Sequence, residues 1–155
     1  MKKIKILNWS LILFIALAII SIVANFGMLL FDYNNFEMIY SKSKLGMISF
    51  YIINTLTFML LYGLYQVQQS FSSFIQNSFF NSKSSEFLKK GGFILILNGL
   101  LSGIANLFPV NESTEISITN YMMYAMIILV GIGLMAVSEI VAKGESIEQE
   151  NSLII

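Results

Sequence analysis

The stretch Leu11–Phe31, LILFIALAIISIVANFGMLLF, is the clearest structural signal in the chain. It has no charged side chain over 21 residues, and about 20 consecutive apolar residues are needed to cross the hydrocarbon core of a bilayer. The apolar region of a cleaved signal peptide has only about 7–15 residues, and the small residues Ala16 and Ala18 lie in the middle of this run. The stretch therefore predicts a retained membrane-spanning helix, with a cleaved signal peptide as the alternative.

Three further uncharged runs follow this first one. The 155 residues are 56% hydrophobic and 12% charged, with a mean hydropathy of +0.75, whereas soluble domains have about 25% charged residues. Because an open strand edge has no hydrogen-bond partner in lipid, we expect an all-α, integral membrane four-helix bundle that forms one domain over residues 1–155. The predicted spans are residues 11–31, 46–67, 91–108 and 118–141.

The distribution of lysine predicts the orientation in the membrane. All nine basic residues are lysines, and seven of them lie on the side of the membrane that holds the N-terminus. Loops rich in lysine stay on the cytoplasmic side, so we expect both termini in the cytoplasm and a multi-pass protein of a bacterial inner membrane. The seven are Lys2, Lys3, Lys5, Lys83, Lys89, Lys90 and Lys143. Lys42 and Lys44 fall on the other side.

The residues that are missing exclude several kinds of chemistry. There is no cysteine and no histidine, so thiolate nucleophiles and the commonest general base, metal ligand and haem ligand are absent. We therefore expect no catalytic residue, no metal site and no cofactor. A net charge of zero and the lack of arginine argue against direct nucleic-acid binding. The middle of each span lacks a charged side chain, which argues against proton-coupled transport.

A polar stripe runs along the third predicted span. Its members recur at helical spacing and include a GxxxG pattern: Asn98, Gly99, Ser102, Gly103 and Asn106. Small residues let helices approach closely in lipid, and amide side chains form hydrogen bonds between helices. We expect this stripe to face the centre of the bundle, with Asn25 and Asn54 as partners. A polar pathway and a homodimer face are the alternatives.

The two connections near the first and second spans carry aromatic residues. Between residues 32 and 44 we expect a polar connection, with Phe31, Tyr33, Phe36 and Tyr40 in the membrane interface. After the second span, Phe71 and Phe74 recur at helical spacing within residues 67–80. This pattern predicts that the second helix extends past the membrane, with its aromatic stripe on headgroups or neighbouring helices. A docking surface for a partner helix is the alternative.

The polar residues that follow predict the start of the next helix. Residues 81–86, NSKSSE, offer several helix N-caps. Glu86 is expected in the first turn, where the helix dipole favours an acid.

The C-terminal tail combines acids with an apolar end. Its acids are Glu145, Glu148 and Glu150, and it closes with Leu153, Ile154 and Ile155. A solvated, frayed tail is one expectation. The other is a docking strip whose carboxylates complement a basic partner and whose apolar end inserts into a groove or pairs with a sheet edge.

Two stretches resemble a known family. Residues Phe80-Asn81 through Phe87-Leu88-Lys89-Lys90-Gly91 resemble a segment that leads into a third helix. In that segment a phenylalanine is followed by small polar residues, a leucine, a basic residue and a glycine. Residues 144–155, GESIEQENSLII, resemble a closing leucine-glutamine-acid-acid-asparagine-acid-leucine-threonine-isoleucine signature. Both are similar to a family of four-pass bacterial membrane proteins catalogued as a domain of unknown function. That family has an acid where Ser152 stands and a threonine where Ile154 stands.

The resemblance also implies a partner. The family is often encoded beside a small helix-turn-helix regulator, so the resemblance implies a membrane partner for a cytoplasmic DNA-binding protein and no catalytic residue. Our first hypothesis is a non-enzymatic membrane protein that anchors or regulates such a cytoplasmic partner. The alternative is a subunit of a transporter or channel for a small solute or lipid. The expected contacts are the lipid bilayer, this regulator protein and a second copy of the chain as a homo-oligomer.

Overall fold

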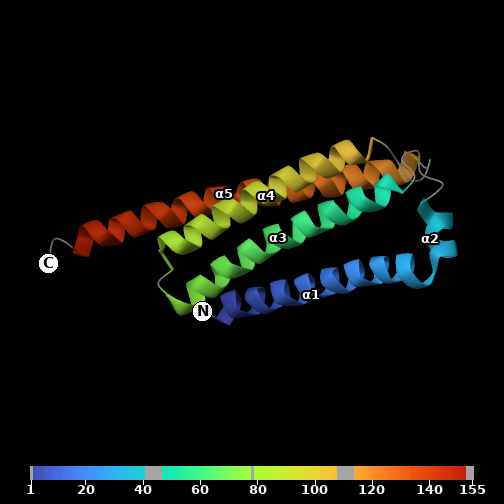
Figure 1. The fold of residues 1–155 in the computed structure, drawn as a ribbon. Coiled ribbons are helices and arrows are strands. Elements are labelled where there is room, and N and C mark those ends of the chain that lie inside the picture. The colour runs from blue at the N-terminus through green and yellow to red at the C-terminus, as the bar shows by residue number, and fades with distance from the viewer. Residues whose placement is uncertain (1, 41–46, 78, 108–113, 153–155) are drawn as a thin grey trace.

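The computed structural model describes residues 2–40, 47–77, 79–107 and 114–152. These residues form five helices and no strand (Figure 1). The helices are α1 (Lys2–Phe31), α2 (Tyr33–Tyr40), α3 (Ile48–Gln76), α4 (Ser82–Ala105) and α5 (Thr114–Ser152). The predicted all-α class is confirmed.

Four of the helices are long and apolar enough to cross a membrane, namely α1, α3, α4 and most of α5. The chain is therefore a multi-pass membrane protein with the predicted four-helix architecture. Each of these helices continues past the predicted span at the end that holds the two termini. Length makes this plain for α5, because 39 residues at 1.5 Å each extend for about 58 Å, nearly twice the roughly 30 Å of a hydrocarbon core.

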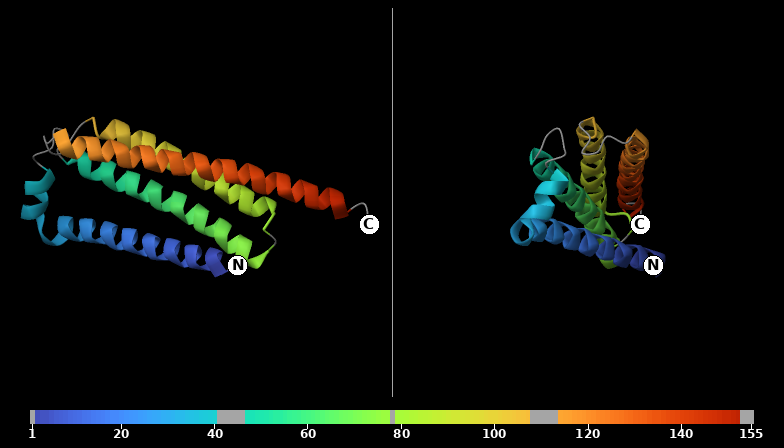
Figure 2. Two further views of the ribbon diagram at one scale, coloured as in Figure 1. Left: turned by 180° about the vertical axis from the view of Figure 1, so that it is seen from behind. Right: turned by 90° about the vertical axis from the view of Figure 1, so that its right-hand side faces the viewer.

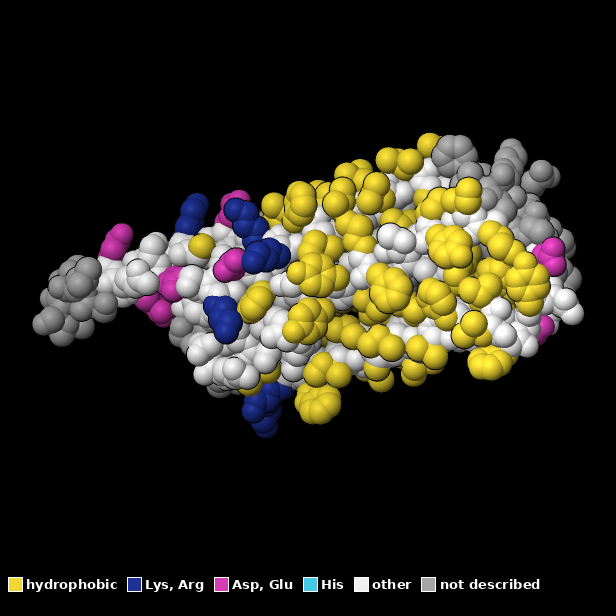
Figure 3. All heavy atoms as spheres, viewed as in Figure 1, with side chains coloured by type: hydrophobic (Ala, Val, Ile, Leu, Met, Phe, Trp, Pro, Cys, Tyr) yellow, Lys and Arg dark blue, Asp and Glu magenta, His cyan; other side chains and the backbone are white. Residues whose placement is uncertain are grey.

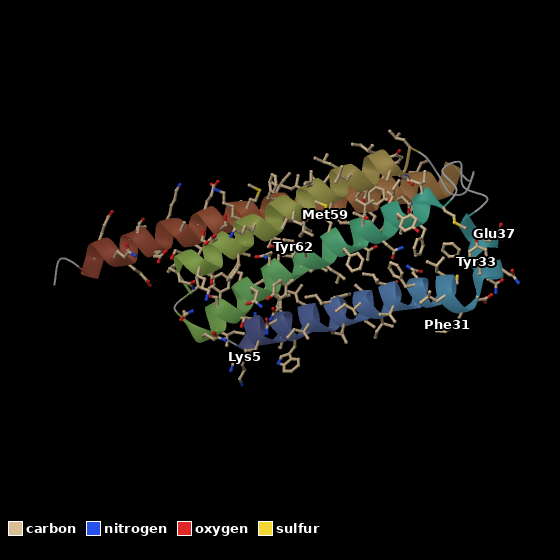
Figure 4. All side chains as sticks on the ribbon, in the orientation of Figure 1. Lys5, Phe31, Tyr33, Glu37, Met59 and Tyr62 are labelled. Atoms are coloured by element: carbon tan, nitrogen blue, oxygen red, sulfur yellow. The ribbon has the colours of Figure 1, made fainter. Side chains whose placement is uncertain are left out.

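The connection after α1 differs from its prediction in one aromatic residue. It contains the short helix α2. Phe36 of α2 is turned into the protein and not outward, because it is 1% exposed and packs edge-on against Phe50 with a centroid separation of 5.0 Å. Phe31 is 90% exposed and lies with Tyr33 at the far end from Lys5, as expected of interfacial aromatics (Figure 4). The sequence pattern does not distinguish Phe36 from the neighbouring aromatic residues, because its burial depends on how α2 is oriented.

The long helices pack in chain order, α1 on α3, α3 on α4 and α4 on α5. Adjacent helices run antiparallel, so the N- and C-termini lie at the same end (Figures 1 and 2). Within the described parts of the chain, α1 and α5 share no extensive interface. Helix α4 is thus the central element, with α3 and α5 as its two neighbours.

The α4–α5 interface depends on a close backbone approach. A Cβ atom added to Gly92 would lie 2.6 Å from the carbonyl oxygen of Gly131, and one added to Gly131 would lie 2.7 Å from that of Gly92. Small residues at such crossings allow the dense helix packing that drives association in lipid. The two glycines therefore set the distance between α4 and α5.

We predict that Gly131→Ala destabilises the fold by about 1–3 kcal/mol, because the added methyl group meets a backbone oxygen that cannot move aside. Gly27→Ala is the matched control, since a Cβ at Gly27 meets nothing within 4 Å. The control should be as stable as the wild type or slightly more stable, because alanine favours helix over glycine. Thermal unfolding of the purified protein in detergent measures both, and equal midpoints would contradict the packing argument.

Candidate functional site

The lysines gather at the end of the molecule that holds both termini. We call this region the lysine end and define it by Lys2, Lys3, Lys5, Lys83, Lys89, Lys90 and Lys143. Figure 3 shows the lysine side chains together at this end, while hydrophobic side chains cover the adjoining face of the helices. Charge and apolar surface are therefore separated along the helix axes, as in proteins that span a membrane.

The turn from α3 to α4 is closed by asparagine side chains. The Asn81 side-chain oxygen Oδ1 accepts a hydrogen bond from the Ser84 backbone N–H at 2.8 Å and another from the Ser73 hydroxyl at 3.1 Å. Asn77 caps α3 by donating its backbone N–H to the Ser73 carbonyl at 2.9 Å. The predicted N-cap is thus present as Asn81, and it also fastens the start of α4 to the end of α3.

Glu86 lies one turn later than predicted. The first turn of α4 holds no acid, because the helix already begins at Ser82. Glu86 instead forms an ion pair with Lys90, one turn further on, with a Nζ–Oε1 distance of 2.6 Å. Both side chains are more than half exposed, so this pair contributes little to stability.

Serine side chains join the three helices at the lysine end. The hydroxyl of Ser70 on α3 donates to the Ser84 carbonyl at 3.0 Å, and the Ser84 hydroxyl donates back to the Ser70 carbonyl at 3.4 Å. On the other side of α4, the Ser85 hydroxyl donates to the Ser138 carbonyl of α5 at 2.8 Å. Ser70 and Ser84 are fully buried. These hydrogen bonds satisfy buried hydroxyl groups and fix the mutual register of α3, α4 and α5.

An apolar cluster lies beside these serines. It consists of Phe74 from α3, Leu88 from α4 and Val141 from α5, and Ile4 of α1 and Phe71 pack against it. Phe74 is only 5% exposed. The aromatic stripe therefore lies on neighbouring helices, as its first interpretation predicted, and Phe74 does not form an exposed docking surface.

Phe80 lies against α5 at Gly144. A Cβ added to Gly144 would overlap the Phe80 ring, so the absence of a side chain at Gly144 leaves room for the ring. Beyond this contact, residues 146–151 of α5 are exposed, and the helix projects past the rest of the molecule (Figure 1). We call residues 145–152 the α5 arm.

The α5 arm carries the three acids singled out in the sequence. Glu145 is half-buried, and Glu148 and Glu150 are exposed. This part of the chain is solvated, as one expectation had it, but it is not frayed, since the backbone is helical through Ser152. Leu153, Ile154 and Ile155 lie outside the described residues. The structure thus presents an acidic helix beyond the lysine end.

The polar stripe of α4 divides between two helix interfaces. Asn98 is 3% exposed and donates its Nδ2 hydrogen to the Leu56 carbonyl of α3 at 2.7 Å. Gly99 faces the other way, where a Cβ would lie 2.9 Å from the Tyr124 carbonyl oxygen of α5. Ser102 is buried as well. The packing interpretation accounts for these three residues.

The remaining members of the stripe behave differently. A Cβ at Gly103 meets nothing within 4 Å, so the two glycines of the GxxxG pattern do not share an interface within the chain. Asn106 lies at the C-cap of α4, and its side-chain oxygen accepts a hydrogen bond from Asn120 at 3.4 Å. Asn54, an expected partner of the stripe, donates instead to the Phe50 carbonyl of its own helix at 2.8 Å.

Two buried amide oxygens are unpaired in the part of the chain that the structure describes, Asn54 Oδ1 and Gln66 Oε1. Gln66 belongs to the α3 face that meets Gly91 of α4. The serine network next to Gln66 was not predicted from the sequence. A signal was present in α4, where Ser84, Gly91 and Asn98 recur every seven residues, a spacing typical of one face of a packed helix.

Comparison of the chain with family models, with curated proteins and with solved structures finds no match.

We predict that Asn81→Ala destabilises the protein by about 0.5–2 kcal/mol, because the α4 N-cap and the link to Ser73 are lost together. Ser82→Ala is the control, since this exposed residue is the first of the helix. Thermal unfolding in detergent again measures the difference. A loss for Ser82→Ala as large as that for Asn81→Ala would show that the cap is not responsible.

Proposed function

We propose that this chain is a non-enzymatic, multi-pass protein of a bacterial inner membrane that anchors or regulates a cytoplasmic protein through the α5 arm. One observation carries the proposal. After its contact with Phe80, α5 continues as an acidic helix that leaves the rest of the molecule. A segment with this geometry is accessible to a partner while the four long helices remain in the membrane.

The lysine end supports the orientation that the proposal requires. Seven lysines at the end with both termini favour the cytoplasm for that end by the positive-inside rule. The opposite end of the described chain carries the acids Asp32 and Glu37. In this orientation the α5 arm extends into the cytoplasm.

The length and charge of the α5 arm favour a protein ligand. The arm comprises about two helical turns at the end of α5, and a helix end with no packed face has little besides its own backbone hydrogen bonds to stabilise it in water. Contact with a partner stabilises such a helix. The carboxylates of Glu145, Glu148 and Glu150 complement a basic surface and raise the rate of encounter with it.

The family resemblance of the tail and of the entry to α4 supports a small DNA-binding protein as that partner. Such proteins carry a basic surface for the phosphate backbone, and an acidic helix competes for the same surface. The chain itself has no arginine and no net charge. In the proposal, the partner therefore binds DNA and the membrane protein holds or releases the partner.

Transport through the polar stripe is the weaker alternative. Asn98 and Ser102 are buried, and the Asn98 amide is already bound to the Leu56 carbonyl. Hydrogen bonds made within the protein leave these groups fewer donors and acceptors for a solute.

We predict that a reporter that is active only in the cytoplasm is active when fused after Ile155, and that a reporter active only in the periplasm is silent there. The physical reason is the excess of lysine at this end. The same two reporters inserted in the connection that holds Lys42 and Lys44 serve as the control and should give the opposite result. Periplasmic activity at the C-terminus would refute the orientation.

We predict that a fluorescently tagged helix-turn-helix protein encoded beside this chain locates at the membrane when the full chain is present. Removal of residues 145–155, and the triple change Glu145→Gln, Glu148→Gln and Glu150→Gln, should each release it, because they remove the acids of the arm. Glu139→Gln is the matched control, as an exposed acid of α5 before the arm. A membrane location that survives loss of the arm would refute the arm as the docking element.

A further inference from the structure

An open hollow lies on α1 at the lysine end. It has a volume of about 480 Å³ and is lined by Lys5, Ile6, Trp9, Ser10 and Leu13. These residues recur at helical spacing, so they share one side of α1. Lys5 lies near the start of this helix, at the outer edge of the molecule (Figure 4). We call this side of α1 the α1 groove.

The α1 groove is uncovered, although the helix that forms it is held in place. Trp9 is 71% exposed and Leu13 61%. On another side of the same turns, Ile4 packs against the apolar cluster at the lysine end. The Asn8 side-chain oxygen accepts a hydrogen bond from the Gln68 amide of α3 at 3.2 Å. These two contacts fix the first turns of α1, so the groove belongs to the folded structure and faces the surroundings of the protein.

The polarity of the groove changes along the helix in the order of a phospholipid. Lysines come first, Trp9 follows at the level typical of lipid headgroups, and apolar side chains continue from it. From Trp9 to Ile20 the helix rises by about 16 Å, which is about half of the roughly 30 Å of a hydrocarbon core. The groove thus spans the headgroup and the acyl chains of one leaflet. The exposed apolar residues of this stretch are Leu13, Leu17 and Ile20.

The lysines beside the groove have no acid on their own helix. Lys2, Lys3 and Lys5 belong to α1, and the first acid of the chain is Asp32. Every other lysine of the lysine end has a glutamate within four positions on its own helix. Among the described residues, none of the three lysines of α1 forms an ion pair within the chain. This part of α1 therefore carries positive charge that a ligand can balance.

The charge distinguishes between the two main classes of phospholipid. A zwitterionic phospholipid carries its own positive group, which balances its phosphate. An anionic phospholipid brings net negative charge to the surface and attracts nearby lysines. Lys2 and Lys5 lie on the same side of the helix as Trp9, at intervals of three and four positions. An anionic phospholipid therefore matches the groove in charge, in length and in the order of its parts.

We propose that the α1 groove binds an anionic phospholipid of the leaflet at the lysine end. The ammonium groups of Lys2 and Lys5 contact its phosphate, Trp9 lies beside the ester groups, and the acyl chains follow Leu13 and Ile20. The inference goes beyond the proposed function, since the lipid binds whether or not a cytoplasmic partner is present.

Trp9 is itself the probe of the groove, because it is the only tryptophan of the chain. The purified full chain is reconstituted in vesicles of phosphatidylcholine with a fixed minor share of phosphatidylglycerol. Bromine atoms on the acyl chains quench tryptophan fluorescence on contact. In one set the phosphatidylglycerol is brominated, and in the other the same amount of phosphatidylcholine is. We expect several-fold stronger quenching by the brominated phosphatidylglycerol, and equal quenching would overturn the proposal.

Charge removal tests the role of the lysines. The double change Lys2→Gln and Lys5→Gln should abolish the preference for phosphatidylglycerol, because it removes the groups that contact the phosphate. The matched control is the double change Lys89→Gln and Lys143→Gln, which removes the same charge from exposed positions of α4 and α5 at the same end. The control should keep the preference. Loss of preference in both double variants would show that the net charge of the lysine end attracts the lipid and would overturn a site on α1.

Moving the probe tests whether the site is local. Trp9→Phe combined with Phe93→Trp places the only tryptophan on α4, at a residue that is 59% exposed and follows Lys89 and Lys90. We expect little preference for phosphatidylglycerol at this position. A preference as strong as at Trp9 would mean that anionic lipid gathers around the whole lysine end, and it would overturn a site in the α1 groove.

A soluble anion is the last alternative. Inorganic phosphate added at constant ionic strength should leave the quenching by brominated phosphatidylglycerol unchanged, because it cannot replace the acyl chains. Constant ionic strength is needed because salt alone screens exposed charges. Relief of quenching by phosphate would assign the groove to a soluble anion and overturn the lipid. The vesicles contain only this chain, so each of these failures leaves the docking of a cytoplasmic partner unaffected, and loss of that docking leaves the lipid site unaffected.

Discussion

Every backbone N–H and C=O group that enters lipid must find its hydrogen-bond partner within the protein, and the rest of this structure depends on that constraint. It makes each crossing a continuous helix, and it leaves close packing as the main attraction between helices. Helix α4 meets both needs at the centre of the fold. Its residues Gly92 and Gly99 approach α5, and Asn98 on another face binds a carbonyl of α3.

The spans could be predicted from the sequence because charge is expensive in lipid. A run such as Leu11–Phe31 has no other stable environment, so its helix follows from length and composition. The helix ends could not be predicted in the same way, since outside lipid they depend on caps and neighbours. The start of α4 at Ser82 depends on the Asn81 cap, and Phe36 is buried only because α2 turns it toward Phe50.

The charged residues of the candidate site could be predicted from the sequence, but the contacts of its side chains could not. The acids Glu145, Glu148 and Glu150 stand out in the sequence, and the structure places them on a helix. Spacing alone left Phe74 either packed on neighbouring helices or exposed as a docking surface, and in the structure Leu88 and Val141 cover it. Spacing identifies a face of a helix, whereas the partner of that face depends on residues far away in the sequence. The serine network shows the same limit, because Ser85 and Ser138 are 53 positions apart.

The continuity of α5 has a mechanical consequence. The helix has no proline from Thr114 to Ser152, and proline is the usual cause of a sharp bend. A rod of this kind has no joint at which motion can be absorbed. Any tilt or rotation of α5 on α4 would be carried along the helix to Glu148 and Glu150 near its end. The helix that is long enough to cross the bilayer is thus continuous with its own acidic end.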